Sequence, residues 1–508
     1  MMFDTDAAYL ALKARDARFD GRLFVGVTST RVYCRPVCRV RTPRQDNCRF
    51  YATAAQAEAA GFRPCLKCRP EIAPADRGLA WSVMDASRTL AHQAAHWLEQ
   101  RAAQGDETTI EALAAALGIT DRHLRRIFLA EHGVTPLQFL QTRRLLLAKQ
   151  LLTDTALPVT QVALAAGFGS VRRFNAAFVE RYRMNPSALR RQAPSGGSGS
   201  GSGSGDSICL QLAYREPYEG EGLRRFLGQR AIPGVEVVQV DGPRPCIRRS
   251  LRIEHEGGEQ AGWLQVSFVA GRPLVRVELA PELALHSARV IGGVRRWLDL
   301  DAMPELIDAA LAPLPGPGTR LPGAIDVFEL VVRAVLGQQV TVAAARTFAT
   351  RLVTAFGEPV QTPWPEVNRL FPSPRAVARL RPEQLGELGI VRQRAAAILA
   401  LAEHWPTLSA LIAGRTAPGV LLSALEALPG IGPWTAHYIA MRALAWPDAF
   451  PPRDVAVLKA LERHCGAHGQ REAERHAQAW SPWRSYAVLR LWASLACAPR
   501  PVEESLVS

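Results

Sequence analysis

The spacing of apolar residues changes several times along the chain. Apolar residues recur at helical spacing from Trp81 to Gln192 and again over residues 281–500. The residues before about position 75 are rich in cysteine and turn residues, and they predict loops with short strands. The alternation of apolar and polar residues that is typical of a half-buried strand is found over residues 207–214, 235–240, 263–271 and 273–280.

The stretch Pro194–Asp206 reads PSGGSGSGSGSGD, and its composition predicts a flexible tether between two functional halves. A chain of 508 residues is also too long for a single core. We therefore expect a multidomain α+β protein. Its expected segments are a small α/β domain over 1–75, an all-α domain over 76–193, the tether over 194–206, a mixed α+β domain over 207–300 and an all-α domain over 301–508.

Basic residues are concentrated in the first part of the chain. Residues 1–194 hold 28 Lys and Arg against 17 Asp and Glu, the remainder holds 33 against 30, and the formal net charge is +14. This density of positive charge indicates an anionic partner, and nucleic acid is the usual one. Charge alone does not separate DNA from RNA or from an acidic protein.

Composition and the amino terminus indicate a cytoplasmic protein without a membrane partner. The chain is 48% hydrophobic and 21% charged, and it has no apolar run of the length that spans a bilayer. The first residues, MMFDTDAAYL, carry acidic side chains where a signal peptide carries basic ones. In such a chain the nine cysteines favour metal or nucleophile chemistry over a disulfide framework.

Two pairs of cysteines predict one zinc ion with four cysteine ligands. Cys34 and Cys38 have three residues between them, and Cys65 and Cys68 have two, so each pair can chelate from one turn. A structural zinc knuckle uses the same arrangement. The alternative is a reactive zinc thiolate close to phosphate. Basic residues that favour this alternative flank both pairs: Arg35, Arg39, Arg41, Arg44, Arg49, Arg63, Lys67 and Arg69.

The segments GRLFVGVTSTRVYCRPVCRVRTPRQDN and FYATAAQAEAAGFRPCLKCRP resemble the amino-terminal domain of Ada-type alkylation-response proteins over about residues 5–72. The resemblance implies that Cys34 accepts a methyl group from a methylphosphotriester in DNA, once per molecule, while the other three cysteines remain ligands. Methylation would remove a negative charge from a site that faces phosphates, so we expect it to tighten DNA binding. Cys48 lies outside the metal spacing and is expected to be an ordinary thiol.

Residues 108–131 and 158–181 each predict a helix, a turn that contains glycine, and a second helix, with Thr120 or Asp121 as a cap. An amphipathic helical hairpin gives the same pattern when it occurs once, but the tandem copies are similar to the paired DNA-binding domain of the AraC family. The resemblance implies promoter binding and transcriptional activation, with RNA polymerase as a further candidate partner. The candidate DNA-contacting residues are Arg122, His123, Arg125, Arg126, Ser170, Arg172, Arg173 and Asn175.

The segment Leu428–Ala436, LPGIGPWTA, predicts two helices joined by a tight glycine hairpin. The backbone of Gly430, Ile431 and Gly432 could then approach DNA phosphates. A helical hairpin without catalysis has the same sequence features. Asp454 follows the hairpin at the start of a predicted helix, where an aspartate is more often a cap than a catalyst.

Residues from about 320 to 497 resemble the AlkA-type 3-methyladenine glycosylases through AVLGQQVTVAAAR, LPGIGPWTAHYIAMRAL, PPRD and WSPWRSYAVLRLWAS, and residues 207–300 resemble that family's amino-terminal domain. The resemblance implies that Asp454 is catalytic. It also implies a monofunctional reaction, since Trp434 stands where bifunctional relatives carry a lysine. The implied base pocket is Trp434, Tyr438 and Trp492, and the implied wedge is Gln338 and Gln339. Val455 and Ala493 stand where the family places aromatic residues beside the aspartate and the tryptophan, which implies a wider pocket.

These features leave three classes of function to distinguish: a methyl-accepting sensor and transcription factor, a repair enzyme that turns over, and a structural zinc protein that binds DNA. We expect the first two to coexist in one monomeric protein whose partner is double-stranded DNA. The Pro-Cys-His-Arg core of a methylguanine methyltransferase is absent from the sequence, so repair of alkylated guanine oxygen is not expected.

Overall fold

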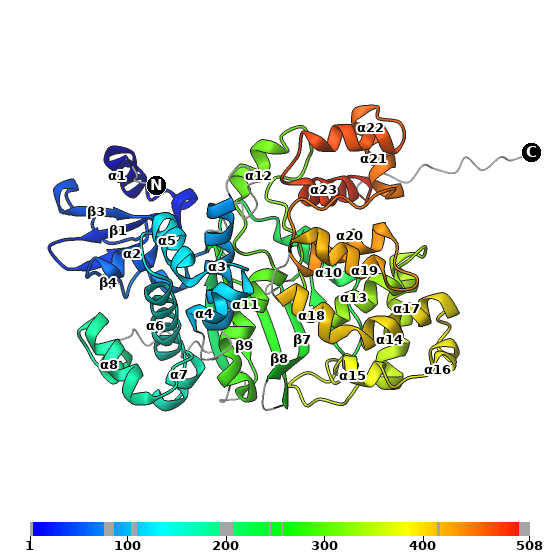
Figure 1. The fold of residues 1–508 in the computed structure, drawn as a ribbon, viewed down its shortest axis with the longest axis horizontal. Coiled ribbons are helices and arrows are strands. Elements are labelled where there is room, and N and C mark those ends of the chain that lie inside the picture. The colour runs from blue at the N-terminus through cyan, green and yellow to red at the C-terminus, as the bar shows by residue number, and fades with distance from the viewer. Residues whose placement is uncertain are drawn as a thin grey trace, which may run out of the picture. The chain divides into compact units, whose positions relative to one another are not determined.

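The computed structural model describes residues 4–75, 86–102, 109–192, 207–242, 245–255, 258–413 and 417–496 (Figure 1). The predicted tether, residues 194–206, lies outside the described residues. Contacts divide the chain into two compact units. The first unit comprises Met1–Glu216, Arg230–Met303 and Thr350–Pro372, and the second comprises Pro217–Gln229, Pro304–Ala349 and Ser373–Ser508.

The amino-terminal part of the first unit is built on a four-stranded sheet with the order β3-β1-β2-β4. Strand β1 pairs antiparallel with β2 and β3, whereas β2 and β4 are parallel, so the ends of β2 and β4 lie side by side. The elements of this zinc-site domain are α1 (Thr5–Ala14), η1 (Ala17–Phe19), β1 (Phe24–Val27), β2 (Val32–Cys34), η2 (Gln45–Asn47), β3 (Cys48–Tyr51), α2 (Ala54–Ala59), β4 (Arg63–Pro64) and η3 (Pro70–Ile72).

Two helix-turn-helix pairs, α4–α5 and α7–α8, are connected by a long helix, α6, and match the predicted segments. Thr120 caps α5 by accepting a hydrogen bond from the His123 amide, as predicted, and Ser170 caps α8 by accepting one from the Arg173 amide. The helices are α3 (Ala86–Ala102), α4 (Ile110–Ala116), α5 (Asp121–His132), α6 (Pro136–Asp154), α7 (Val159–Ala165), α8 (Val171–Tyr182) and α9 (Pro186–Gln192).

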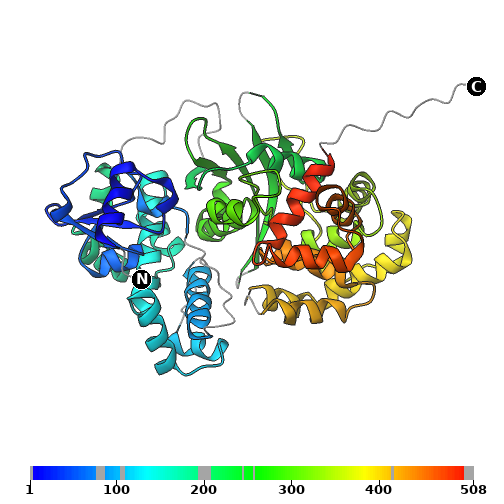
Figure 2. The same cartoon turned by 90° about the horizontal axis from the view of Figure 1, so that it is seen from above.

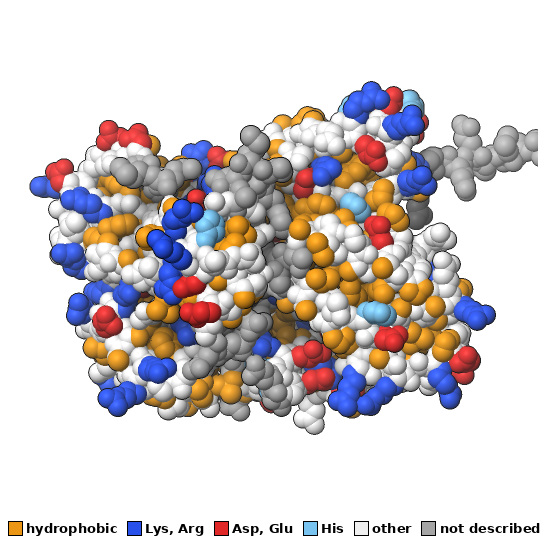
Figure 3. Space-filling view, viewed as in Figure 1, with side chains coloured by type: hydrophobic (Ala, Val, Ile, Leu, Met, Phe, Trp, Pro, Cys, Tyr) orange, Lys and Arg blue, Asp and Glu red, His pale blue; other side chains and the backbone are white. Residues whose placement is uncertain are grey.

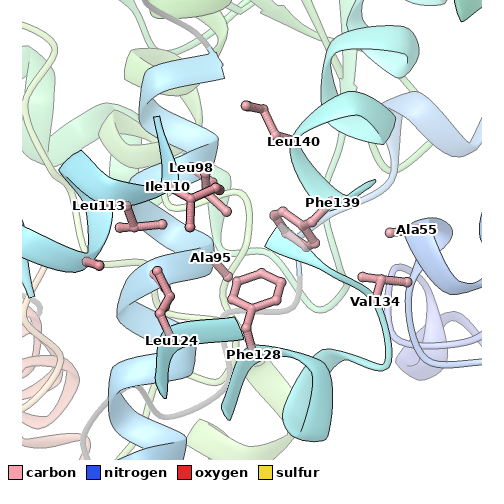
Figure 4. Close-up of a cluster of buried hydrophobic side chains, with 12 residues drawn as sticks. Ala55, Ala95, Leu98, Ile110, Leu113, Leu124, Phe128, Val134, Phe139 and Leu140 are labelled. Atoms are coloured by element: carbon pink, nitrogen blue, oxygen red, sulfur yellow. The ribbon is translucent and has the colours of Figure 1, made fainter. Parts of the chain in front are cut away.

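The first helix pair shares a hydrophobic core with the zinc-site domain (Figure 4). Leu98, Leu124 and Phe128 are completely buried in it, and the Phe139 ring of α6 packs edge-on against Phe128 at a centroid distance of 5.6 Å. Ala55 of α2 belongs to the same cluster. The zinc-site domain and the helices that follow it are therefore packed as one body.

A five-stranded antiparallel sheet with the order β5-β9-β8-β7-β6 forms the rest of the first unit (Figure 2, in green). The predicted strands are confirmed, but Cys246–His255 was not predicted to be a strand, because the arginines in CIRRSLRIEH interrupt the apolar alternation. The elements are β5 (Ile208–Ala213), β6 (Glu236–Gln239), β7 (Cys246–His255), β8 (Gly258–Phe268), β9 (Leu274–Leu279), η4 (Pro281–His286) and α11 (Ser287–Trp297).

The second unit is helical in the described residues, and α14 spans the boundary between the units. Helix α10 belongs to this unit although it lies between β5 and β6 in sequence, so the chain crosses between the units more than once. Its helices are α10 (Gly220–Gln229), α12 (Pro304–Ala310), α13 (Val327–Leu336), α14 (Val342–Phe356), α15 (Pro374–Val377), α16 (Pro382–Glu387), α17 (Arg392–Glu403), α18 (Trp405–Ala413), α19 (Pro418–Glu426), α20 (Pro433–Ala443), α21 (Val455–Cys465), α22 (Gly469–Gln478) and α23 (Arg484–Ala496).

Within the described part of the chain, no single helix has both the length and the hydropathy of a membrane span. Helices α17 and α18 meet that test only when they are taken together, and a bend of 67° separates them.

A buried polar cluster connects α2 to α6 and α8. The Glu58 carboxylate accepts hydrogen bonds from the Tyr33 hydroxyl at 3.1 Å and from the Thr142 hydroxyl at 3.1 Å, and the Arg181 guanidinium lies 3.7 Å away. Burial is the largest influence on this group and raises the pKa of Glu58 to about 7, although Arg181 and the two hydroxyls act in the opposite direction. The protonated form of Glu58 is therefore favoured in the folded protein below about pH 7.

We expect the stability of this region to fall as the pH rises from 5 to 8. A carboxyl group whose pKa is raised by folding stabilises the protein below its unfolded pKa, and this contribution is lost as the pH passes through about 7. Glu58→Gln should remove this pH dependence, which is on the order of 3 kcal/mol at most. Urea unfolding of the full chain at both pH values measures it, with Glu180→Gln on the exposed face of α8 as the control. An equal loss of stability in wild type and Glu58→Gln would contradict the assignment.

Candidate functional site

The four predicted metal ligands lie together. Cys34 ends β2, and Cys65 directly follows β4, where its amide donates to the Tyr33 carbonyl at 3.0 Å. The parallel pairing of β2 with β4 thus brings the two cysteine pairs to one end of the sheet. One ligand atom from each of Cys34, Cys38, Cys65 and Cys68 lies within 4.8 Å of the others. This donor set fits one tetrahedral zinc ion.

The electrostatics of the sulfur cluster also fit a cation. Hydrogen bonding to the Cys34 thiol lowers the pKa of Cys65 and lowers that of Cys38 to about 7. Hydrogen bonding to Cys38 raises the pKa of Cys34, and hydrogen bonding to Cys34 raises the pKa of Cys68. Four adjacent thiols cannot all ionise without a compensating charge, and a bound zinc ion would supply it.

Arg35 does not have the role predicted from its position beside Cys34. Its guanidinium forms a buried ion pair with the Asp20 carboxylate and donates to the Cys68 carbonyl at 3.0 Å, and the residue is only 6% exposed. Arg69 is similarly paired with Glu71 and Asp154. These two arginines therefore form internal ion pairs next to the cysteine cluster, and they do not face a ligand at the surface. The basic residues that remain exposed around it are Arg39, Arg41, Arg44, Arg49 and Lys67.

Burial alone does not single out Cys34 among the four cysteines. Cys34, Cys38 and Cys65 are 6%, 4% and 7% exposed, whereas Cys68 is half-buried. Cys48 is buried in a separate apolar cluster and its thiol donates to the Arg44 carbonyl at 3.3 Å, in agreement with an ordinary thiol.

In the second unit, Asp454 is the N-cap of α21 and is 7% exposed. Its carboxylate accepts hydrogen bonds from three N–H groups: Trp434 Nε1 at 2.8 Å, Trp492 Nε1 at 3.1 Å and the Val457 amide at 2.8 Å. The hydrogen bond from the Val457 amide is the expected N-cap bond of α21. The two indole donors instead belong to other helices, α20 and α23. These indole N–H groups hold a negative charge at a fixed position beside aromatic rings.

The three aromatic residues predicted for a base pocket lie next to one another. The Trp434 and Tyr438 rings are stacked at a centroid distance of 5.3 Å and an interplanar angle of 7°, and the Trp492 ring lies 6.3 Å from Tyr438. All three are half-buried. Val455, which follows Asp454 in the sequence, is 78% exposed, and Ala493, which follows Trp492, is also exposed, so small side chains occupy both positions at which relatives are expected to carry aromatic residues.

The hairpin forms between α19 and α20 as predicted. Gly430 has φ +75°, a left-handed conformation that favours glycine, and a Cβ atom there would lie 3.2 Å from the Gln393 carbonyl oxygen. Ile431 is 5% exposed and anchors the turn, whereas Gly432 is exposed and precedes Pro433 at the start of α20. Gly432 leaves its backbone open to a ligand.

The two glutamines predicted as a wedge differ in their surroundings. Gln338 Nε2 donates to the Gly430 carbonyl at 2.9 Å and to the Thr435 hydroxyl at 3.1 Å, and Arg394 donates to the Gln338 carbonyl at 2.5 Å. Gln339 is exposed and has φ +53°, a conformation that is costly for a residue other than glycine. Gln338 therefore braces the hairpin, and Gln339 is the residue presented to solvent.

The DNA-contacting candidates on α5 and α8 are mostly on the surface. Arg122, Arg125 and Arg126 of α5 are exposed, as are three residues of α8, and Figure 3 shows basic side chains gathered over the region of α5. Arg125 is 2.9 Å from Asp121, and His123 contacts Arg126 at 3.0 Å, so these three candidates have partners within the helix. Ser170 is engaged as the cap of α8. The exposed α8 candidates are Arg172, Arg173 and Asn175.

Arg442 also belongs to this site, although the sequence motifs do not predict it. It is 6% exposed, donates to the Tyr438 hydroxyl at 2.8 Å and to the Pro322 carbonyl at 2.8 Å, and lies over the Phe226 ring at 5.2 Å. The buried guanidinium therefore fixes the position of the Tyr438 hydroxyl. The spacing of Tyr438 and Arg442, four residues apart on one predicted helix, was the available signal.

Four family models match the chain in the predicted order. The metal binding domain of Ada matches residues 7–71, and a helix-turn-helix domain matches residues 113–192. The AlkA N-terminal domain matches residues 209–326, and the HhH-GPD superfamily of base excision DNA repair proteins matches residues 332–485. These matches confirm the resemblances predicted from the sequence.

Relatives are similar to the whole chain or to one half of it. A probable bifunctional transcriptional activator/DNA repair enzyme AlkA of Mycobacterium tuberculosis is 38% identical over 510 residues, which cover 97% of each chain. The DNA-3-methyladenine glycosylase 2 of Escherichia coli is 34% identical over 55% of this chain and 95% of its own length. The bifunctional transcriptional activator/DNA repair enzyme Ada of Escherichia coli is 36% identical over 32% of this chain and 42% of its own length.

Substitution of the two glutamines should separate their roles. Gln338→Ala leaves the Gly430 carbonyl and the Thr435 hydroxyl without this partner, so we expect a loss of about 1–2 kcal/mol in the stability of the second unit. Gln339→Ala should change stability by about 0.5 kcal/mol or less, because the side chain is exposed and alanine keeps the same backbone cost at φ +53°. Thermal unfolding of the full-length variants gives both values. A larger loss for Gln339→Ala than for Gln338→Ala would contradict this assignment.

Proposed function

Because this chain belongs to the family of bifunctional transcriptional activators and DNA repair enzymes that join Ada-type and AlkA-type domains, we propose that it carries out two separate repair reactions on alkylated DNA. The carboxy-terminal half would excise alkylated purines such as 3-methyladenine as a monofunctional DNA-3-methyladenine glycosylase II. The amino-terminal half would transfer a methyl group from a DNA methylphosphotriester to Cys34. The observation that carries the first proposal is the carboxylate of Asp454, fixed by the indole N–H groups of Trp434 and Trp492.

Excision places a positive charge on the sugar, and Asp454 is the group that would stabilise it. As the bond between the sugar C1′ and the base breaks, its electron pair leaves with the base and C1′ becomes oxocarbenium-like. A water molecule then adds to C1′ and loses its proton to Asp454 or to solvent. A cationic alkylpurine leaves as a neutral base, so this reaction needs no acid to protonate the leaving group. Trp434 in place of a lysine supports hydrolysis without a covalent intermediate.

The aromatic residues would select the cationic base. A flipped alkylpurine can stack on the electron-rich face of Trp434, Tyr438 or Trp492, which favours a positively charged ring. The same two indoles donate to Asp454, so base binding and placement of the carboxylate depend on shared side chains. Gln339, exposed and strained, is our candidate to occupy the space that the base leaves. The small Val455 and Ala493 side chains favour a wide range of substrates.

Methyl transfer would take place at the sulfur cluster. Cys34, Cys38, Cys65 and Cys68 would hold a zinc ion, which would keep the thiols deprotonated at neutral pH. The Cys34 sulfur attacks the methyl carbon, an S–C bond forms, and the C–O bond breaks to leave a phosphodiester anion. The thioether product has no ready route back, so each molecule reacts once. Loss of one thiolate charge would then strengthen binding to DNA phosphates near Arg39, Arg41 and Lys67.

Double-stranded DNA is the partner of both halves, through the helix-turn-helix and base-excision domains. We propose that the methylated protein binds a promoter through α5 and α8 and activates transcription, with RNA polymerase as its partner there. We also propose a monomer that works in the cytoplasm, where alkylated chromosomal DNA would be met. The phosphate contacts would come from exposed basic residues such as Arg122 and Arg172.

Asp454→Asn should reduce the release of 3-methyladenine from methylated duplex DNA on the order of a hundredfold or more, because a neutral amide cannot stabilise the cationic sugar. Chromatography of the released bases measures this loss. Asp241→Asn, an exposed position outside the site, is the matched control and should release bases at the wild-type rate. Normal release by Asp454→Asn would show that the catalytic assignment is wrong, and no release by wild type would reduce this half to a binding module.

Cys34→Ser should abolish methyl acceptance and leave base release unchanged. After incubation with methylated DNA, mass spectrometry of the wild-type peptide that contains Cys34 should show one added methyl group, and no other cysteine should carry it. Cys465→Ser, at an exposed thiol far from the cluster in sequence, is the control that should still accept one methyl. Methylation found on Cys68 instead would move the acceptor to the most exposed of the four ligands.

A further inference from the structure

A buried arginine, Arg215, joins two domains of the first unit. It follows β5, belongs to the sheet-containing domain, and is 3% exposed. Its guanidinium donates to the Asp301 carbonyl at 3.0 Å and to the Ala302 carbonyl at 3.3 Å within that domain. It also donates to the Asp20 carbonyl at 3.1 Å and the Ala75 carbonyl at 3.0 Å, which belong to the zinc-site domain. One side chain thus uses acceptors from both halves of the chain.

A second set of polar contacts surrounds this arginine. Asp301, 2% exposed, accepts a hydrogen bond from the Ala75 amide at 2.9 Å and pairs with Arg295 at 2.6 Å. Arg295 in turn donates to the Ile72 and Ala73 carbonyls at 3.1 and 3.2 Å. An Arg-Asp pair of the sheet-containing domain therefore clamps both the amide and the carbonyls of one short segment, residues 72–75.

Apolar packing accompanies these bonds. Ile72 of η3 is 4% exposed and packs with Ala213 and Leu274 of the sheet, with Val269 at the edge of the cluster. Gln150 of α6 also donates to the Gln211 carbonyl of β5 at 2.9 Å. A Cβ atom at Gly21 would lie 1.8 Å from the Pro74 carbonyl oxygen within the zinc-site domain, and 3.2 Å from Arg215 Nη2 across the interface. The fit leaves no room for a side chain there.

We propose that the zinc-site domain docks on the glycosylase's sheet-containing domain through Arg215, so that these two domains of the first unit form one body in solution. A desolvated guanidinium is stable only when acceptors replace water, and half of the four acceptors named for Arg215 come from the other domain. The halves are covalently joined, so an interface too weak to hold two separate proteins can still be closed within one chain.

The interface also reaches the sulfur cluster. Asp20 is 5% exposed and is bonded through both its backbone and its side chain. Its carbonyl accepts a hydrogen bond from Arg215, and its carboxylate pairs with Arg35, the neighbour of Cys34. Arg35 contacts the Cys68 carbonyl. A continuous chain of hydrogen bonds, with one ion pair between Asp20 and Arg35, therefore connects the cysteine ligands to the glycosylase half without passing through the joining segment.

The test is hydrogen–deuterium exchange of full-length variants altered on opposite sides of the interface. Arg215→Ala should speed exchange of the amides of residues 72–75, on the zinc-site side, by about tenfold, because it removes charge-assisted bonds. Ile72→Ala, made on the zinc-site side, should speed exchange of the amides of residues 299–302 in the other domain. Arg272→Ala, at an exposed position in the turn before β9, should leave both segments protected as in wild type.

Small-angle scattering gives the second readout, since release of the contact should increase the radius of gyration in both variants. Protection lost only on the side that carries the substitution, with an unchanged radius of gyration, would overturn the proposal. Circular dichroism of the same preparations shows that each variant is folded. Neither readout of docking depends on methyl transfer or base excision, so failure of the proposed function would leave this test intact.

Discussion

A charged side chain that leaves water must find partners that replace it, and this requirement governs where the elements of this protein meet. The Lys149 and Glu71 side chains, 1% and 0% exposed, lie 2.5 Å apart and join α6 to η3. Asp454 is surrounded by N–H groups from three helices. The Arg215 guanidinium donates hydrogen bonds to backbone carbonyls of two domains. In each case the partners are distant in sequence, so the buried charge and the assembled fold depend on each other.

The two candidate reaction centres apply this requirement in opposite ways. The sulfur cluster concentrates negative charge from four ligands and needs a cation to complete it. Asp454 carries a single negative charge and accepts hydrogen bonds from two neutral indole groups. Because these donors are uncharged, the net charge of the carboxylate remains able to stabilise a positive charge that develops nearby. The first arrangement suits a thiolate that is consumed once. The second suits a carboxylate that is returned unchanged after each turnover.

Support behind each centre comes from arginines that do not face the substrate. Arg35 and Arg69 are paired within the zinc-site region, and Arg442 holds the Tyr438 hydroxyl from the interior of α20. Their guanidinium groups bind backbone carbonyls or carboxylates at several points, which fixes orientation as well as charge. The high arginine content of this chain therefore has two uses, and only the exposed part of it is available to DNA.

The sequence by itself determined the features that depend on short spacing: the paired cysteines, the tandem helix pairs with the Thr120 cap, the glycine hairpin and the acid that follows it. Chelation, capping and a tight turn involve residues within a few positions of one another, so their pattern is visible in the chain. Only the tertiary structure decided which residues share a partner across elements. It showed Arg35 buried, Gln338 tied to Gly430, Arg442 behind Tyr438 and β7 in the sheet. These outcomes depend on burial and on contacts between distant segments, which the order of residues along the chain does not specify.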